Sequence, residues 1–284
     1  MEAAPFRVAS GDLVLRGEEV GEGPPILLAH GLTATRRYVV HGSNALPRGG
    51  YRLVSYDARG HGDSDPGPTG SYGYSELAAD LAAVVGERAG GAPAVLAGHS
   101  MGAHTIVRFA LENPEGIAAL VLIGPAAIGG TPDPDSLAGW DRLADALESG
   151  GIEGFVRAND NPRLDPRWRE TTARITRERL GRHRDLDAVG QALREVPRSV
   201  PFDGLDELEQ LELPALVVAS HDDVDPGHPY SVAAAWAEHL RHARLVSEQP
   251  GQSPLAWQGG RLSRVIADFL NERGASSRAP YPSR

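Results

Sequence analysis

The sequence contains no cysteine and no lysine, and its 28 basic residues are all arginines. The missing thiols exclude disulfides, thiolate nucleophiles and cysteine-ligated metal sites. The missing amines exclude Schiff-base chemistry and the lysine of phosphate-binding loops. Any nucleophile or proton acceptor must therefore be a hydroxyl, an imidazole or a carboxylate.

Long apolar runs are also missing, since the longest, such as Ile117–Ile123, are too short to cross a bilayer. The N-terminus lacks the basic and apolar regions of a signal peptide, so we expect a soluble, cytoplasmic protein. The net charge of −10 disfavours nucleic acid and anionic membranes as partners. We expect a small-molecule substrate and a monomer or homodimer. No clustered ligand spacing occurs, so we expect no cofactor and no metal.

Short apolar runs bounded by glycine and proline alternate with helical patterns along the chain. This alternation predicts the α/β class, with a mostly parallel central sheet and helices on both of its faces. An antiparallel pair within residues 6–20 is expected at the sheet edge. The expected strands are 25–29, 51–56, 93–97, 118–123, 215–219 and 244–247, and the expected helices are 74–89, 101–113, 232–241 and 260–273.

Residues 125–212 break the alternation, because they contain helical patterns and no convincing buried strand. We predict that they form a helical lid inserted into a core made of residues 1–124 and 213–273. Asp165-Pro166 provides a helix start signal inside this segment. The remaining residues, 274–284, are expected to form a flexible tail.

The pattern G-x-S-x-G occurs at residues 98–102, where an expected strand meets an expected helix. So sharp a turn leaves room only for glycine at positions 98 and 102, and it raises Ser100 above the sheet as a candidate nucleophile. The Met101 N–H begins the helix, where unpaired amides favour negative charge. A second amide, that of Leu32, follows Gly31 at the end of another strand. Together the Leu32 and Met101 amides predict an oxyanion hole.

Three segments resemble the α/β-hydrolase superfamily: His30-Gly31-Leu32, the stretch 57–64 (DARGHGDS) and Gly98–Gly102. The similarity covers about residues 6–124 and 213–272, and is greatest to the esterase, enol-lactonase and cofactor-free haloperoxidase branch. It implies an α/β-hydrolase fold with a Ser-His-Asp triad. The acid is expected after the strand at 215–219, with Asp223 as the first candidate, Asp222 as the second and Asp225 as the third.

The resemblance places the general base at position 252, but the residue there is Gln252. A glutamine amide does not titrate near neutral pH, and loss of the base costs roughly 10⁴–10⁶ in turnover in related enzymes. His228 and His221 flank the acid loop and are the candidate substitute bases. The other histidines are assigned to motif loops (His30, His61, His99), to the core or the pocket floor (His104) and to the surface (His41, His183, His239, His242).

Four interpretations remain open. We favour an α/β-hydrolase-fold enzyme that acts on a small carbonyl-bearing metabolite without hydrolysis, by cyclisation, elimination or rearrangement as in secondary metabolism. Gln252 would then orient Ser100, a water or the substrate. The alternatives are a serine esterase or lactonase whose histidine was changed to glutamine, a hydrolase that uses His228 or His221, and a catalytically silent small-molecule binding protein.

The predicted lid is rich in arginine, with nine arginines against four acids between residues 157 and 184. On a helical wheel Arg179 shares one side with Trp168. If this side faces the active site, Arg179 could bind a substrate carboxylate and Trp168 could form an apolar wall, as could Trp257. The competing interpretation is a solvated or ion-paired arginine face.

Overall fold

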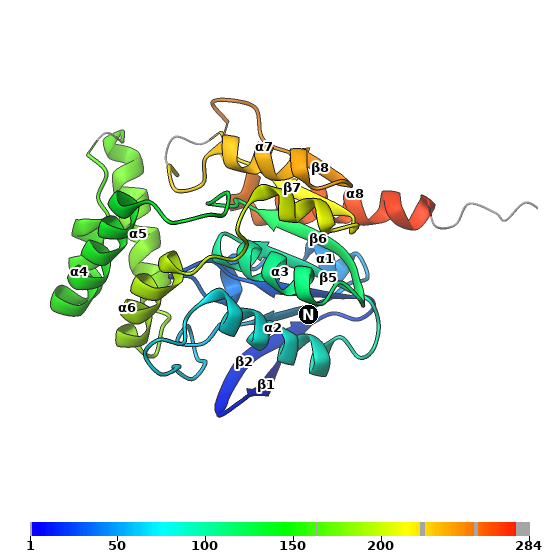
Figure 1. Cartoon of the computed structure of the whole chain (residues 1–284), viewed down its shortest axis with the longest axis horizontal. Helices are drawn as coiled ribbons and strands as arrows, with labels where there is room; N and C mark the ends of the chain where they lie inside the picture. Colours follow the sequence, from blue (N-terminus) through cyan, green and yellow to red (C-terminus); the bar gives the residue numbers. More distant parts are fainter. Residues whose placement is uncertain (1, 163, 222–224, 253–254, 277–284) are drawn as a thin grey trace, which may run out of the picture.

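A computed structural model describes residues 2–162, 164–221, 225–252 and 255–276. Within these residues, one sheet runs through the molecule (Figure 1) in the order β1-β2-β4-β3-β5-β6-β7-β8. Its strands are β1 (Ala4–Ser10), β2 (Leu13–Val20), β3 (Pro25–Ala29), β4 (Arg52–Tyr56), β5 (Ala94–His99), β6 (Ile117–Ile123), β7 (Ala215–Val218) and β8 (Ala243–Val246).

The strand pairings confirm the predicted sheet. β1 pairs with β2, and β2 with β4, in antiparallel fashion. All other neighbouring strands from β4 to β8 are parallel. The central strands β3 and β7 are buried along their whole length. Their continuous valine, leucine and isoleucine content therefore reflects burial on both faces of the sheet.

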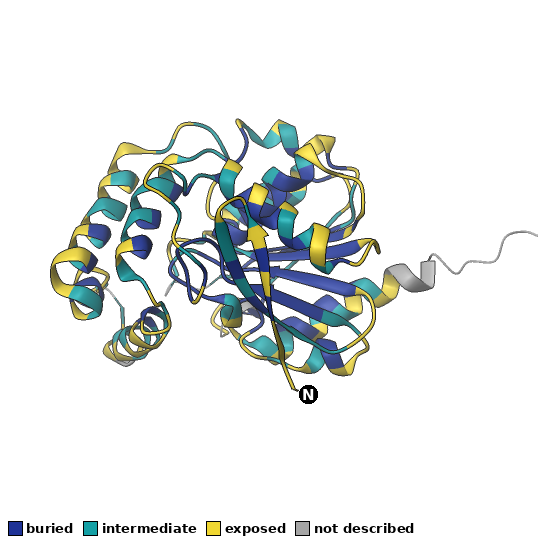
Figure 2. Cartoon of the chain, turned by 90° about the horizontal axis from the view of Figure 1, so that it is seen from below, coloured by how far each residue is buried: buried dark blue, intermediate teal, exposed yellow. Residues whose placement is uncertain are grey.

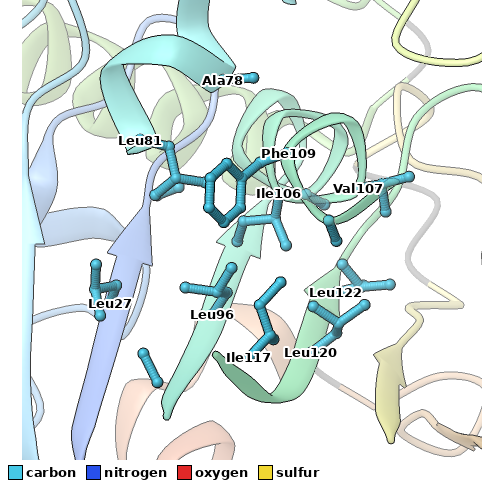
Figure 3. Packing of buried hydrophobic residues seen from close by; sticks show 14 of the residues in the cluster. Leu27, Ala78, Leu81, Leu96, Ile106, Val107, Phe109, Ile117, Leu120 and Leu122 are labelled. Carbon is cyan, nitrogen blue, oxygen red and sulfur yellow. The ribbon is translucent and has the colours of Figure 1, made fainter. Parts of the chain in front are cut away.

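Helices cover both faces of the sheet, as expected. Leu27 and Leu96 point towards α2 and α3 on one face and pack with Leu81 and Phe109 (Figure 3). The alternate strand residues, such as Val95, pack against α1 and α8 on the other face. The helices are α1 (Ala45–Arg48), α2 (Tyr74–Arg88), α3 (Met101–Glu112), α4 (Pro134–Ala158), α5 (Pro166–Leu180), α6 (Leu186–Glu195), α7 (Tyr230–His239) and α8 (Gly259–Ser276), with 3-10 turns at Arg36–Tyr38, Val196–Arg198, Leu205–Gln210 and Leu255–Trp257.

Helices α4, α5 and α6 lie between β6 and β7 in the chain and stand together at one side of the sheet (Figure 1). We call them the inserted helices. Their outer surfaces are largely exposed, whereas the central strands β3 to β7 are mostly buried (Figure 2). At the C-terminus, α8 continues to Ser276, so residues 274–276 are helical rather than part of a tail. No helix in the described part of the chain is long and apolar enough to cross a membrane.

Candidate active site

Ser100 lies at a strained turn between β5 and α3. Its φ of 52° and ψ of −116° fall in a region that residues with a side chain rarely adopt. The Ser100 N–H donates to the Ile123 carbonyl, at 2.9 Å, which holds the turn against the end of β6. Such strain persists only where the surrounding structure enforces it, and it is common at catalytic positions. The half-buried serine is thus raised at the carboxyl end of the sheet.

The two glycines of the turn are required by close backbone contacts. A Cβ atom at Gly98 would overlap the backbone of Gly102, and a Cβ atom at Gly102 would overlap the Ala29 carbonyl. This confirms that the spacing of the motif reflects packing around Ser100. A Cβ atom at Gly31 would also lie only 3.3 Å from the Ser100 Cβ. The β3 loop therefore runs directly beside the serine.

The two amides expected to form an oxyanion hole have no partner among the described residues. The Leu32 N–H lies in a turn and makes none of the described hydrogen bonds. The Met101 N–H opens α3, so it has no partner within the helix. Leu32 and Met101 belong to the same apolar cluster, together with Ala188 and Ala192 of α6. Side chains of α6 thus pack in the same cluster as the side chains of the two residues that carry these amides.

Asp225 and His228 form an acid–imidazole pair in the loop before α7. The His228 Nδ1 donates to the Asp225 Oδ2 at 2.7 Å, and the His228 N–H donates to the Asp225 carbonyl at 3.2 Å. This turn places the Asp225 and His228 side chains, three positions apart in the sequence, on the same side of the loop. Both side chains are largely buried. The carboxylate fixes the imidazole tautomer and leaves Nε2 free to accept a proton.

The Asp225–His228 pair lies beside the Ser100 turn. The rings of His228 and His99 have centroids 5.1 Å apart, and His99 directly precedes the serine. A Cβ atom at Gly124 would lie 3.5 Å from the His228 ring, and Gly124 follows the residue that accepts the Ser100 N–H. The structure therefore brings His228, one of the two candidate substitute bases, to the Ser100 turn.

The electrostatics of this cluster keep Asp225 ionised and His99 neutral. Burial alone would raise the pKa of Asp225, but the hydrogen bond from His228 and the nearby charge of Arg179 hold it below its ordinary value. Burial lowers the pKa of His99 to about 3, and the charge of His228 acts in the same direction. A charged carboxylate next to an imidazole stabilises the imidazolium that forms during general base catalysis.

The structure describes no hydrogen bond between Gln252 and this cluster. Gln252 is exposed, and its side chain makes no hydrogen bond with the described residues. The expectation that the amide orients Ser100, a water or the substrate stays a prediction. Asp223 and Asp222, the first two candidates for the acid, lie outside the described residues. The His221 ring stacks on the Tyr230 ring, with centroids 3.9 Å apart.

The two tryptophans expected as apolar walls, Trp168 and Trp257, are partly exposed. Trp168 is 39% exposed and Trp257 is 37% exposed, which makes them two of the large exposed apolar side chains of the described chain. Trp168 lies in the first turn of α5, and a wall role for either tryptophan stays a prediction.

Arg179, near the end of α5, is turned inwards. Its Nε is buried without a hydrogen-bond partner, and no described carboxylate forms an ion pair with the guanidinium. The charge of Arg179 nevertheless lowers the pKa of Asp225 and of His99, so it lies close to both. Burial lowers the pKa of Arg179 itself. A buried guanidinium with unused donors is typical of an anion-binding position.

Glu248 is a buried carboxylate that the sequence patterns did not single out. Its Oε1 accepts hydrogen bonds from the Ser220 hydroxyl at 2.9 Å and from the His221 N–H at 2.6 Å. Its Oε2 accepts from the Leu255 N–H at 3.3 Å. Glu248 therefore joins the loops that follow β7 and β8, and it is a structural rather than a reacting group. Among the residues described, no group of side chains is arranged to hold a metal ion.

Together the fold and the site define an α/β enzyme built around a serine on a strand–turn–helix elbow. The family model for the alpha/beta hydrolase fold matches residues 24–200, and the chain belongs to this family.

Relatives by sequence agree with this assignment. The chain is 27% identical to "Putative carbamate hydrolase RutD" of Azorhizobium caulinodans over 276 residues, which cover 92% of this chain and 94% of the relative. It is 24% identical to "Putative non-heme chloroperoxidase" of Synechocystis over 269 residues, or 89% and 93% of the two chains. The enol-lactonase of Burkholderia xenovorans has the same fold, with a TM-score of 0.76, 22% identity and coverage of 94% and 100%.

Proposed function

We propose that this enzyme hydrolyses a small ester, lactone or carbamate through Ser100, with His228 as the general base and Asp225 as its acid partner. The observation that carries this proposal is the 2.7 Å hydrogen bond between His228 and Asp225, beside the Ser100 turn. The case for a non-hydrolytic reaction rested on the missing base at position 252. A carboxylate-supported imidazole in another loop supplies that base. The similarity to a protein named as a carbamate hydrolase supports an acyl substrate.

In this mechanism His228 Nε2 accepts the hydroxyl proton as Ser100 Oγ attacks the substrate carbonyl. The Leu32 and Met101 amides stabilise the resulting oxyanion, which is worth roughly 3 kcal/mol for each donor in related enzymes. His228 then gives its proton to the leaving group, and a water repeats the sequence to release the acid. The Ser100 hydroxyl makes no hydrogen bond with the described residues. The proposal therefore requires His228 to turn towards it when substrate binds.

Covalent capture of the serine tests the proposal directly. With a p-nitrophenyl ester we expect turnover with an acyl-enzyme intermediate, and with a fluorophosphonate we expect one adduct on the peptide that contains Ser100. Mass spectrometry locates the adduct, and Ser100→Ala is the control that should carry none. Failure of the folded protein to react with either reagent would contradict hydrolysis through Ser100. Tight ligand binding without any turnover would instead identify a binding protein.

We further propose that the substrate carries a carboxylate or another anionic group, held by Arg179. The support is the buried Nε without a partner and the position of the charge near Asp225 and His99. His228 occupies Oδ2 of Asp225, and no described ion pair joins this carboxylate to Arg179. Charge-assisted hydrogen bonds from an arginine fork are both strong and directional. A substrate anion would supply the missing acceptors.

Arg179→Gln is expected to lower kcat/KM for an anionic ester by about 10- to 100-fold, as for the loss of one or two charge-assisted hydrogen bonds. The comparison uses p-nitrophenyl hydrogen succinate and the neutral p-nitrophenyl butyrate, which are similar in length. Most of the loss should appear in KM, and only for the succinate. Arg177→Gln is a matched control, because Arg177 lies on the same helix and pairs with Glu153 at the surface. An equal loss for both esters would refute the anion-binding role.

A further inference from the structure

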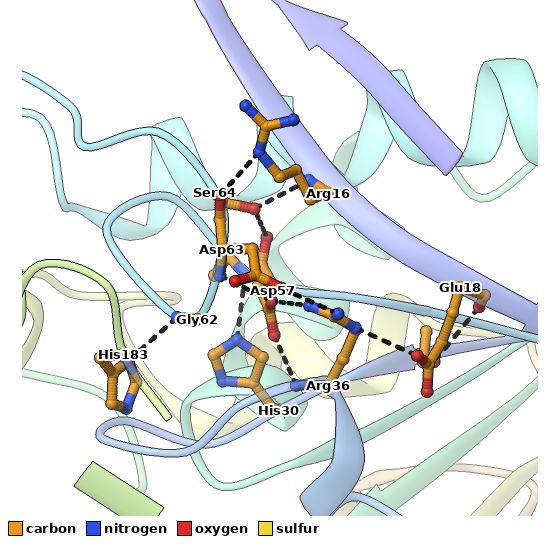
Figure 4. A network of polar contacts seen from close by, with 11 residues as sticks. Arg16, Glu18, His30, Arg36, Asp57, Gly62, Asp63, Ser64 and His183 are labelled. Atoms are coloured by element: carbon orange, nitrogen blue, oxygen red, sulfur yellow. Dashed lines mark hydrogen bonds and ion pairs between the residues drawn. The ribbon is translucent and has the colours of Figure 1, made fainter. Parts of the chain in front are cut away.

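His183 links the inserted helices to two backbone groups of the core. It lies between α5 and α6, and its ring nitrogens contact the Gly62 N–H at 2.9 Å and the Thr33 carbonyl at 3.0 Å. Figure 4 shows its ring beside the loop that contains Gly62. The amide can only donate, so His183 Nδ1 accepts and the proton is on Nε2. The Nε2–H then donates to the Thr33 carbonyl. Both nitrogens are used, in a single neutral tautomer.

Thr33 is the residue after the oxyanion donor Leu32, and its backbone is strained. Its φ is 64°, in the left-handed region that disfavours a β-branched side chain. The Ala34 N–H donates to the Gly31 carbonyl at 3.0 Å, so residues 31–34 form a tight turn with Thr33 at its third position. This position in such a turn normally requires glycine. The bond from His183 is the described hydrogen bond that holds the Thr33 carbonyl in place.

The same turn is held on its other side by His30. The His30 Nδ1 contacts the Gly31 carbonyl at 2.9 Å, and its Nε2 accepts from the Ala58 N–H at 2.9 Å. The His61 ring lies between the other two imidazoles, with centroids 5.1 Å from His30 and 5.5 Å from His183. Burial lowers the pKa of His183 to about 4 and that of His61 well below its ordinary value. The row of imidazoles therefore stays neutral and keeps its hydrogen bonds in place.

We propose that His183 is a positioning residue for the oxyanion hole: by holding the Thr33 carbonyl, it keeps the neighbouring Leu32 N–H directed at the reacting carbonyl oxygen. His183 lies between α5 and α6. The geometry of the oxyanion hole therefore depends on how the inserted helices pack against the core. The proposal rests on the proposed function of Ser100 for its kinetic consequence. Its structural consequence, an ordered turn at residues 31–34, is independent of the reaction.

The first test is kinetic. His183→Leu is expected to lower kcat for a p-nitrophenyl ester by roughly 30- to 100-fold, since removing one oxyanion donor costs about 10²–10³. KM should change by less than about twofold. An arylboronic acid, which forms a tetrahedral adduct on a reactive serine, should bind more weakly by the same factor as kcat. His183→Gln, which can both donate and accept, should restore part of the loss. His239→Gln is the control, because His239 lies at the surface beside Glu209.

A second variant distinguishes positioning from general damage. Thr33→Gly removes the backbone strain, so the turn no longer depends on being held, and adding His183→Leu should then cost less than about fivefold. The proposal would be overturned if His183→Leu lowered kcat as much in the Thr33→Gly variant as in the unaltered protein. A loss of kcat with a parallel rise in KM would also overturn it. Circular dichroism and thermal melting establish that each variant is folded.

Amide hydrogen exchange gives a readout that does not need activity. His183→Leu should increase exchange at residues 31–34 by at least about tenfold while the core strands keep their protection. Unchanged exchange in this turn would refute the proposal even in an active enzyme. If the unaltered protein neither turns over esters nor binds the boronic acid, the proposed hydrolysis is wrong, and the exchange result still decides the role of His183.

Discussion

His228→Ala should reduce kcat for ester hydrolysis by about 10⁴- to 10⁶-fold, the range seen when the imidazole of a serine triad is removed. The reason is that no other described imidazole near Ser100 combines a bound carboxylate with a free ring nitrogen. His99 is adjacent, but burial holds its pKa at about 3, which makes it a weak base. KM should remain within about twofold, because the residue acts on the proton in the transition state. Steady-state kinetics with p-nitrophenyl butyrate measures both constants.

Gln252 provides the matched comparison for His228. Gln252→Ala should change kcat by less than about twofold, because the side chain is exposed and makes no hydrogen bond with the described residues. Asp225→Asn should lower kcat by about 10⁴-fold, because an amide at this position would no longer fix the correct tautomer of His228. If His228→Ala left kcat unchanged and Gln252→Ala greatly reduced it, the assignment of the base would be reversed. A gain of several hundredfold in Gln252→His would indicate a dormant triad with the base at that position.

The fold could be predicted from the sequence because its signals are local. Buried strands such as Pro25–Ala29 are short apolar runs between glycine and proline, and the serine turn is defined by glycines whose Cβ atoms would overlap the backbone. Leu32 and Met101 could likewise be placed, because each amide follows from the strand end or helix start beside it. These features need only the neighbouring residues in the chain.

The contacts of His183 join segments that are distant in the sequence. His183 was expected at the surface, but its partners Gly62 and Thr33 are 121 and 150 positions away in the sequence. Asp225 was placed third among the acids because the resemblance maps the acid onto Asp223, which lies outside the described residues. Counting backwards from Pro229, which caps α7, gives a turn that joins Asp225 to His228. The i,i+3 spacing of an acid and a histidine before a helix was the available signal.

Asp80→Ala should have the largest effect on stability, lowering the free energy of unfolding by about 3–5 kcal/mol. Asp80 lies on α2 with a fully buried side chain, 0% exposed, and Arg59 is 9% exposed. Two parallel hydrogen bonds join them, from Nε to Oδ2 at 2.7 Å and from Nη2 to Oδ1 at 2.8 Å. Removing the carboxylate leaves a buried guanidinium charge without its counter-ion, which costs far more than the net value of the pair.

Urea denaturation monitored by fluorescence measures this loss. Glu112→Gln is the control: it disrupts the exposed Arg108–Glu112 pair within α3, which should be worth less than about 0.5 kcal/mol. A loss for Asp80→Ala no greater than that of the control would show that solvent reaches Arg59 and compensates its charge. The slope of the transition should be similar in both variants if each unfolds in one cooperative step.

The same substitution should also weaken catalysis, for a reason that connects the fold to the site. Arg59 anchors the loop 57–64, in which the Ala58 N–H donates to His30 and the Gly62 N–H donates to His183. These two histidines bind the carbonyls on either side of the Leu32 amide. A loop released from α2 would loosen both contacts, so kcat of the folded Asp80→Ala fraction should fall while KM stays nearly constant. A variant that loses stability but keeps full kcat would show that the loop holds its position without Arg59.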